Sequence, residues 1–163
     1  DDTAGILAEK LADVGARLLV PTLERYLAGD LSPTPQDNSQ ATICSMIKKD
    51  DGHIDWSKPA AFIARMVRAY DPWPGTYTMW NGHRLLVHRA VAVSRSSVVG
   101  DHLAPGTIIQ ESADLNVTTG DGVLLVVELQ LEGRKRLSAA EFLRGYPAFV
   151  GSVLGTESPH ETV

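Results

Sequence analysis

The sequence predicts a mainly β fold with flanking helices, in the α+β class. Between residues 76 and 131, short segments rich in β-branched and aromatic residues alternate with turns, as strands do. The five expected strands are residues 76–80, 84–93, 106–110, 115–119 and 123–131. Asn81-Gly82 predicts a hairpin between the first two, because both turn positions favour a positive φ. Short antiparallel strands joined in this way predict a small, closed or nearly closed barrel of the OB type.

An amphipathic helix is expected ahead of the strands, at residues 2–28. Its apolar side chains recur at the helical spacing of one face: Leu7, Leu11, Val14 and Leu18. Thr3 or Asp2 is the natural N-cap, and Gly29-Asp30 should end the helix. Pro21 is expected to kink it or to start a second helical piece. The apolar face needs a partner, either the domain that follows or one that is absent from this chain.

Two further helices are expected. The first occupies residues 57–70, with Ser57 as its N-cap and Pro59 in its first turn. Its apolar stripe consists of Phe62, Ile63, Met66, Val67 and Tyr70. Lys58, Arg65 and Arg68 fall on the opposite side, which is either simply solvated or contacts phosphates. A short helix at residues 138–143 follows the strands, where Glu141 is placed for a capping box.

Charge is unevenly distributed along the chain. Fifteen Lys and Arg residues against 20 Asp and Glu residues give a net charge of -5, which on average disfavours a nucleic-acid partner. Residues 1–55 carry this whole excess, whereas residues 56–163 are balanced. Within residues 48–95, a stretch that ends at Arg95, basic side chains outnumber acidic ones by eight to four. This locally basic stretch is where a phosphate-binding surface is expected.

Motifs for catalysis and metal binding are missing from the sequence. The histidines have no metal-site spacing: His53, His83, His88, His102 and His160. The lone Cys44 is expected to be a small apolar residue without a disulfide partner. The longest strongly apolar run, residues 123–127, is far shorter than a membrane helix. We therefore expect no catalytic residue, no metal, no bound cofactor and no membrane span in this chain.

Four blocks of sequence carry a resemblance. They are Asp2-Thr3-Ala4-Gly5, Lys49-Asp50-Asp51-Gly52-His53-Ile54-Asp55-Trp56, Arg68-Ala69-Tyr70-Asp71-Pro72-Trp73-Pro74-Gly75 and Thr119-Gly120-Asp121-Gly122. In order and spacing, residues 2–145 resemble the C-terminal half of the methionyl-tRNA formyltransferase family. The resemblance implies three parts. Residues 1–29 would be the terminal helix of a truncated Rossmann-like catalytic domain, residues 30–55 an inter-domain linker, and residues 56–163 an OB-like C-terminal domain with a polar tail.

The resemblance also implies a function. Members of the family transfer a formyl group from 10-formyltetrahydrofolate to the methionine of initiator tRNA, for translation initiation in the bacterial cytoplasm or an organellar matrix. Their catalytic residues and folate-binding loop lie in the N-terminal catalytic domain, upstream of the part that resembles this chain. Because the chain begins at Asp1-Asp2 and its first methionine is Met46, we interpret it as a piece of a longer protein. We expect it to be inactive alone and to bind no cofactor, with initiator methionyl-tRNA and the missing catalytic domain as partners.

The resemblance further implies a basic surface that holds tRNA. The candidates are Lys48, Lys49 and Arg68, followed by Lys58, Arg65, Arg84 and Arg89. Met46 stands where members of the family commonly have a lysine, which removes one expected contact. Trp73 is expected to pack under the second helix rather than to stack on RNA, and Trp56 and Trp80 are expected to be buried.

Two other functions remain open from the sequence. The same domain could belong to a formyltransferase for a nucleotide-sugar amine or to another folate-dependent enzyme of this type. The chain could also be a free-standing OB-like RNA-binding or scaffolding module, although the helix at residues 2–28 would be unnecessary there.

Overall fold

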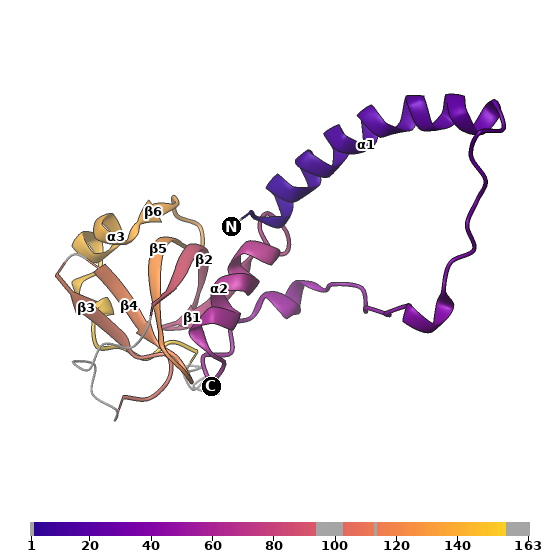
Figure 1. The fold of residues 1–163 in the computed structure, drawn as a ribbon. Helices are drawn as coiled ribbons and strands as arrows, with labels where there is room; N and C mark the ends of the chain where they lie inside the picture. The colour runs from indigo at the N-terminus through magenta and orange to yellow at the C-terminus, as the bar shows by residue number, and fades with distance from the viewer. Residues whose placement is uncertain (1, 94–102, 113, 156–163) are drawn as a thin grey trace, which may run out of the picture.

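The computed structural model describes residues 2–93, 103–112 and 114–155. Arg95, His102, His160 and the polar tail beyond residue 155 lie outside the described residues. Three α-helices and an antiparallel sheet make up the fold (Figure 1), which confirms the predicted α+β class. The helices are α1 (Ala4–Leu27), α2 (Ala60–Ala69) and α3 (Ala139–Gly145).

The sheet contains all five predicted strands and one short additional strand. These are β1 (Thr76–Trp80), β2 (His83–Val93), β3 (Ile108–Glu111), β4 (Asp114–Thr118), β5 (Val123–Leu131) and β6 (Leu137–Ser138). The order across the sheet is β1-β2-β5-β4-β3, with β6 paired to β5, and every pairing is antiparallel. Asn81 and Gly82 connect β1 to β2 with φ values of 49° and 74°, so the hairpin forms where both residues can adopt positive φ.

The sheet is not closed into a barrel. Its edge strands β1 and β3 do not pair with each other in the part of the chain that the structure describes. Instead, the last described residues bridge them: the amide of Leu154 donates to the carbonyl of Gly106 at 2.9 Å, and that of Gly155 donates to Met79 at 2.9 Å. This irregular segment hydrogen-bonds to backbone groups near both edges of the sheet. The fold therefore resembles the predicted barrel, but its edge strands do not pair with each other within the described residues.

One hydrophobic core joins the sheet to α2 and α3, which lie on opposite sides of it (Figure 1). On the α3 side, the rings of Phe142 and Phe149 pack against Trp80, with the Phe149 centroid 4.9 Å away and edge-on at 88°. Edge-to-face packing of this kind suits the charge distribution of aromatic rings. Trp56 and Trp80 are both buried, as predicted.

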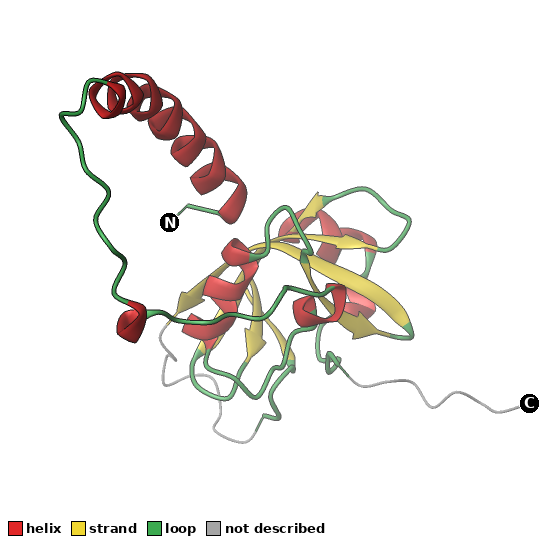
Figure 2. Cartoon of the chain, turned by 90° about the vertical axis from the view of Figure 1, so that its right-hand side faces the viewer, coloured by secondary structure: helices red, strands yellow, loops and turns green. Residues whose placement is uncertain are grey.

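Helix α1 extends away from this body. Thr3 caps it, as predicted, and it is a continuous, gently curved helix through Pro21 rather than two pieces (Figure 1). None of its residues is buried. Its first turn touches the body where the Gly5 amide donates to the carbonyl of Asp71 at 3.0 Å. Beyond α1, the predicted linker returns to the body as a long loop (Figure 2). None of the described helices is long and apolar enough to cross a membrane.

Helix α2 begins later than expected and presents a different face to the core. Pro59 is its N-cap, because the Ser57 hydroxyl instead donates to Asp55 Oδ1 at 2.6 Å, and the prediction of Ser57 as N-cap is wrong. Its buried residues are Ala60, Ile63, Ala64 and Val67. The two alanines let the helix lie close to the sheet, which turns Phe62 outward with 46 % of its surface exposed. Phe62 therefore lies outside the buried face, whereas Ile63 and Val67 of the same expected stripe are buried.

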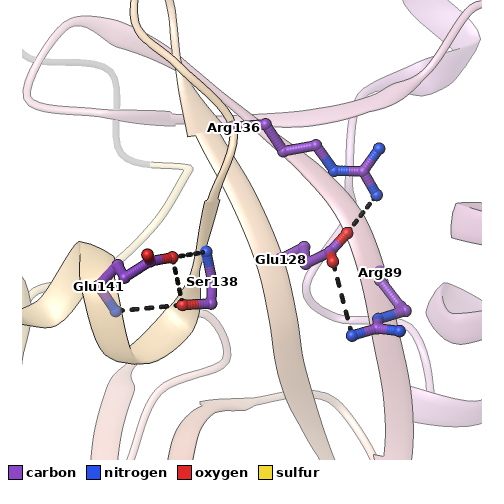
Figure 3. Close-up of polar contacts among 5 residues, drawn as sticks. All are labelled: Arg89, Glu128, Arg136, Ser138 and Glu141. Atoms are coloured by element: carbon purple, nitrogen blue, oxygen red, sulfur yellow. Dashed lines mark hydrogen bonds and ion pairs between the residues drawn. The ribbon is translucent and has the colours of Figure 1, made fainter.

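Helix α3 has the predicted capping box (Figure 3). The Glu141 amide donates to Ser138 Oγ at 3.4 Å, and the Ser138 amide donates back to Glu141 Oε2 at 2.9 Å. The Ser138 hydroxyl and then its amide hold the pKa of Glu141 below its ordinary value of 4.5. Stability linked to this carboxylate is therefore complete above that ordinary pKa and is lost as the pH falls through the lowered one.

Replacing Ser138 with alanine is expected to lower the free energy of unfolding by about 1 kcal/mol at neutral pH, because the first turn of α3 loses its capping oxygen. Urea denaturation at several pH values would measure this. The difference from the unmodified protein should shrink as the pH falls below 4.5, the ordinary pKa, and through the lowered pKa that Glu141 has in the folded protein. Ser138→Thr keeps a hydroxyl and is the control, so an equal loss in both variants would contradict the capping explanation.

Candidate nucleic-acid interface

The predicted tRNA-binding residues fall into two groups, one around α2 and one on the sheet. Lys48 and Lys49 lie at the start of a 3-10 helix, Lys49–Gly52, which ends the linker. Asp51 Oδ2 accepts the Lys48 amide at 2.7 Å and so holds this turn. Both lysines are exposed, and neither ammonium has a partner among the described residues. They present two free positive charges beside α2.

The other three residues of this group differ in how free they are. Arg65 is exposed on α2 and has no hydrogen bond or ion pair within the described part of the chain. Lys58 lies 3.6 Å from Asp55 Oδ2, but both side chains are more than half exposed, so the pair is weak. Arg68 is half-buried, and its Nη1 donates to the carbonyl of Ala64 at 3.2 Å. Arg65 is therefore the free arginine of the group.

The two arginines on the sheet have partners inside the chain. The guanidinium of Arg84 stacks 3.5 Å from the centroid of the Tyr77 ring, in a cation–π contact. Tyr77 in turn lies 5.2 Å from the ring of His53. Arg89 Nη2 is 3.5 Å from Glu128 Oε1, and Arg136 pairs with the other oxygen of the same carboxylate (Figure 3). Arg84 and Arg89 are therefore less available for phosphates than Lys48, Lys49 and Arg65.

A pocket of about 380 Å³ lies between the end of the linker and the outer face of α2. It is lined by Asp51, His53, Asp55, Lys58, Phe62, Ile63, Arg65, Met66, Ala69 and Tyr70. Most of this lining is apolar, and charged groups of both signs stand around it. The hydroxyl and the amide of Ser57 lower the pKa of Asp55, so this carboxylate is charged at neutral pH. In the described residues, no group of His, Cys, Asp or Glu side chains could hold a metal ion.

Comparison with known proteins places this chain in a family. Residues 46–147 match the model of the formyl transferase, C-terminal domain. The chain belongs to this family. The methionyl-tRNA formyltransferase of Chloroflexus aurantiacus is 44% identical over 147 residues, which are 89% of this chain and 46% of that protein. The methionyl-tRNA formyltransferase of Roseiflexus sp. is 41% identical over 97% of this chain and 48% of its own length. The chain thus spans about half the length of these relatives.

Solved structures show the same fold at lower identity. A variant of HypX from Aquifex aeolicus matches 99% of this chain and 29% of its own, with a TM-score of 0.63 and 21% identity. HypX from the same organism in complex with tetrahydrofolic acid matches 86% of this chain and 24% of its own, with a TM-score of 0.56 and 22% identity. These likenesses concern the fold, whereas the family match confirms the resemblance seen in the sequence.

Two motifs of this formyl transferase C-terminal domain hold its entry segments in place. Trp56 is buried and its Nε1 donates to Thr78 Oγ1 at 3.0 Å, which ties the end of the linker to β1. The carbonyl of Asp71 accepts the Gly5 amide from α1. Trp73, two residues on, is 60% exposed. The prediction that it packs under α2 is wrong, because α2 lies directly on the sheet through its small residues.

Sequence reasoning missed three side chains that shape this surface: His53, Tyr77 and Glu128. Tyr77 and His53 come together through the bridge between their backbones, and Glu128 stands opposite Arg89 in the pairing of β5 with β2. The strands β2 and β5 are not consecutive along the chain, so their pairing had to be known first. The only signal was the alternation of residues within each strand, which placed Arg84 on the outer side of β2.

Proposed function

We propose that this chain is the tRNA-positioning C-terminal part of a methionyl-tRNA formyltransferase. The parent enzyme would transfer a formyl group from 10-formyltetrahydrofolate to the methionine of initiator tRNA, in the bacterial cytoplasm or an organellar matrix. Membership of the family supports this proposal, as do relatives above 40% identity that bear this enzyme's name. These relatives favour it over the nucleotide-sugar and free-standing alternatives.

The observation that carries the RNA-binding role is the set of free cations beside α2. Lys48, Lys49 and Arg65 are exposed and unpaired in the described chain; Arg65 lines the pocket, and the two lysines closely precede Asp51, which also lines it. Such groups neutralise phosphates and position an RNA without reading its sequence. In this proposal, residues 1–29 are the last helix of the catalytic domain, residues 30–55 are the linker that follows it, and residues 56–163 form the domain that holds tRNA. We assign no catalytic residue to this chain.

A salt series would test this role. The chain is expected to bind initiator and elongator methionine tRNAs alike at low salt, with an affinity that falls as salt rises. The double variant Lys48→Ala/Lys49→Ala and the single variant Arg65→Ala should each weaken binding. Each phosphate contact removed should reduce the slope of log affinity against log salt by about one. Filter binding or fluorescence anisotropy would measure both quantities.

Arg144→Ala is the matched control, because it removes one exposed positive charge from α3, on the other side of the sheet (Figure 1). It should leave the slope unchanged. Arg84→Ala and Arg89→Ala should have smaller effects than Arg65→Ala, since both arginines have partners within the chain. Absence of binding at low salt, or an equal loss with Arg144→Ala, would contradict the proposal.

A further inference from the structure

One wall of the pocket beside α2 is acidic. It consists of the chain that leads into α2, where the carboxylates of Asp51 and Asp55 line the pocket together with His53 and a single cation, Lys58. Asp55 Oδ1 already accepts the amide and the hydroxyl of Ser57, at 3.0 and 2.6 Å. Asp51 Oδ2 accepts the Lys48 amide, but Asp51 Oδ1 has no donor among the described residues. This wall can therefore accept hydrogen bonds from a ligand.

The opposite wall, formed by α2, is apolar and basic. Phe62 is nearly half exposed, and Met66 and Tyr70 continue the apolar lining along the helix. Arg65 stands three residues after Phe62, so the two side chains are neighbours on the helix surface. An aromatic ring and an unpaired cation thus lie side by side, across the pocket from carboxylates.

We propose that this pocket binds an unstacked guanine base of the RNA, with an adjoining phosphate on Arg65. Guanine carries two neighbouring donors on one edge, its N1–H and its amino group, which suit a carboxylate acceptor such as Asp51. Proteins commonly hold unstacked bases by aromatic stacking and hydrogen bonds to that edge, and the exposed ring of Phe62 offers the stacking surface. Adenine presents an acceptor where guanine presents N1–H, so a carboxylate discriminates between them.

The charges around the pocket favour a nucleotide in a longer RNA over a free amino acid. A carboxylate wall and one arginine would also suit the two charges of an amino acid. However, Lys58 also lines the pocket, and Lys48 and Lys49 closely precede the lining residue Asp51 in the chain, so the region holds more positive charge than a single ligand carboxylate would neutralise. A chain of phosphates uses all of them. This inference rests on the proposed RNA-binding function and names the part of the RNA that is held.

The three methionines provide a direct test, in the full chain labelled with 13C at the methionine methyl groups. Met66 lines the pocket, whereas Met46 lies in the linker and Met79 in β1. Titration with guanosine 5′-monophosphate should shift the Met66 resonance to saturation and leave the other two unchanged. Adenosine 5′-monophosphate should bind at least tenfold more weakly.

Variants test the contribution of each wall of the pocket separately. Phe62→Ala, on the surface of α2, should abolish the Met66 shift, and Asp51→Asn should abolish the preference for guanine over adenine. Val91→Ala, which shortens another exposed apolar side chain, should change neither. An unshifted Met66 at millimolar guanosine monophosphate, an equal response to adenosine monophosphate, or a response to leucine alone would overturn the proposal.

Binding of tRNA, measured in parallel, distinguishes failure of the pocket from failure of the proposed function. If tRNA binds with the expected salt dependence while Met66 does not respond to guanosine monophosphate, the guanine pocket is wrong and the tRNA role stands. If Met66 responds as expected but tRNA does not bind at low salt, the pocket recognises guanine, but the tRNA role is wrong and the assignment of that guanine to tRNA fails with it. Unchanged tRNA affinity in Phe62→Ala would also count against the pocket.

Discussion

Replacing Gly120 with alanine is expected to destabilise the fold by about 3 kcal/mol, because the new methyl group would collide with backbone rather than with a movable side chain. A Cβ at this position would overlap the carbonyl oxygen of Ser57 and lie 2.6 Å from its carbonyl carbon. The amide of Gly120 donates to the carbonyls of Trp56 and Lys58, at 2.9 and 3.2 Å. The turn at Gly120 and residues 56–58 therefore cannot move apart without losing these hydrogen bonds.

Chemical denaturation would measure this loss, and Gly145→Ala provides the matched control. Gly145 ends α3, and a Cβ there would meet nothing within 4 Å. The same substitution should change the free energy of unfolding by no more than about 0.5 kcal/mol at this position. Similar losses of unfolding free energy in the two variants would show that the close backbone contact at Gly120 does not cause the destabilisation.

Replacing Trp56 with alanine is expected to cost about 3–5 kcal/mol, as for other buried large aromatic residues. Its side chain is 5% exposed, and a Cβ at Gly106 would already lie 3.3 Å from the indole, so the ring fills its space tightly. The substitution would empty that space and leave the Thr78 hydroxyl without its indole donor. Because Trp56 ties the linker to β1, the loss should appear as a lower midpoint of global unfolding.

Two comparisons make this prediction specific. Trp73→Ala removes the same side chain from a position that is 60% exposed, and it should cost less than about 1 kcal/mol. Trp56→Phe should recover most of the packing and lack only the hydrogen bond to Thr78, which is worth about 1 kcal/mol. Equal losses for Trp56→Ala and Trp73→Ala would contradict the burial argument.

The elements of the fold could be predicted because their signals are local. The turn at Asn81 and Gly82 needs only two residues that tolerate positive φ, and the capping box needs only Ser138 and Glu141. Both formed as expected. The start of α2 could not be predicted in this way, because the Ser57 hydroxyl donates to the carboxylate of Asp55 and does not cap the helix. Two local interactions competed there, and the sequence does not rank them.

The candidate site was predicted only as a set of charges. The sequence ranked Lys48, Lys49 and Arg68 first, and it did not distinguish Arg65 from Arg84 and Arg89. Their different surroundings depend on pairing between distant segments. Arg89 meets Glu128 across the β2–β5 ladder, and Arg84 meets a ring from β1. The pocket likewise needs the linker to fold back onto α2.

The sequence by itself determined the α+β class, the five main strands, the capped third helix and the family. These depend on residue patterns within short segments, or on a whole set of motifs in order. Only the tertiary structure decided that the sheet stays open, that Phe62 and Trp73 face outward, and that, among the seven candidate residues, Lys48, Lys49 and Arg65 have no partner in the described part of the chain. The physical reason is the same in each case: exposure and pairing are set by neighbours that lie far away along the chain.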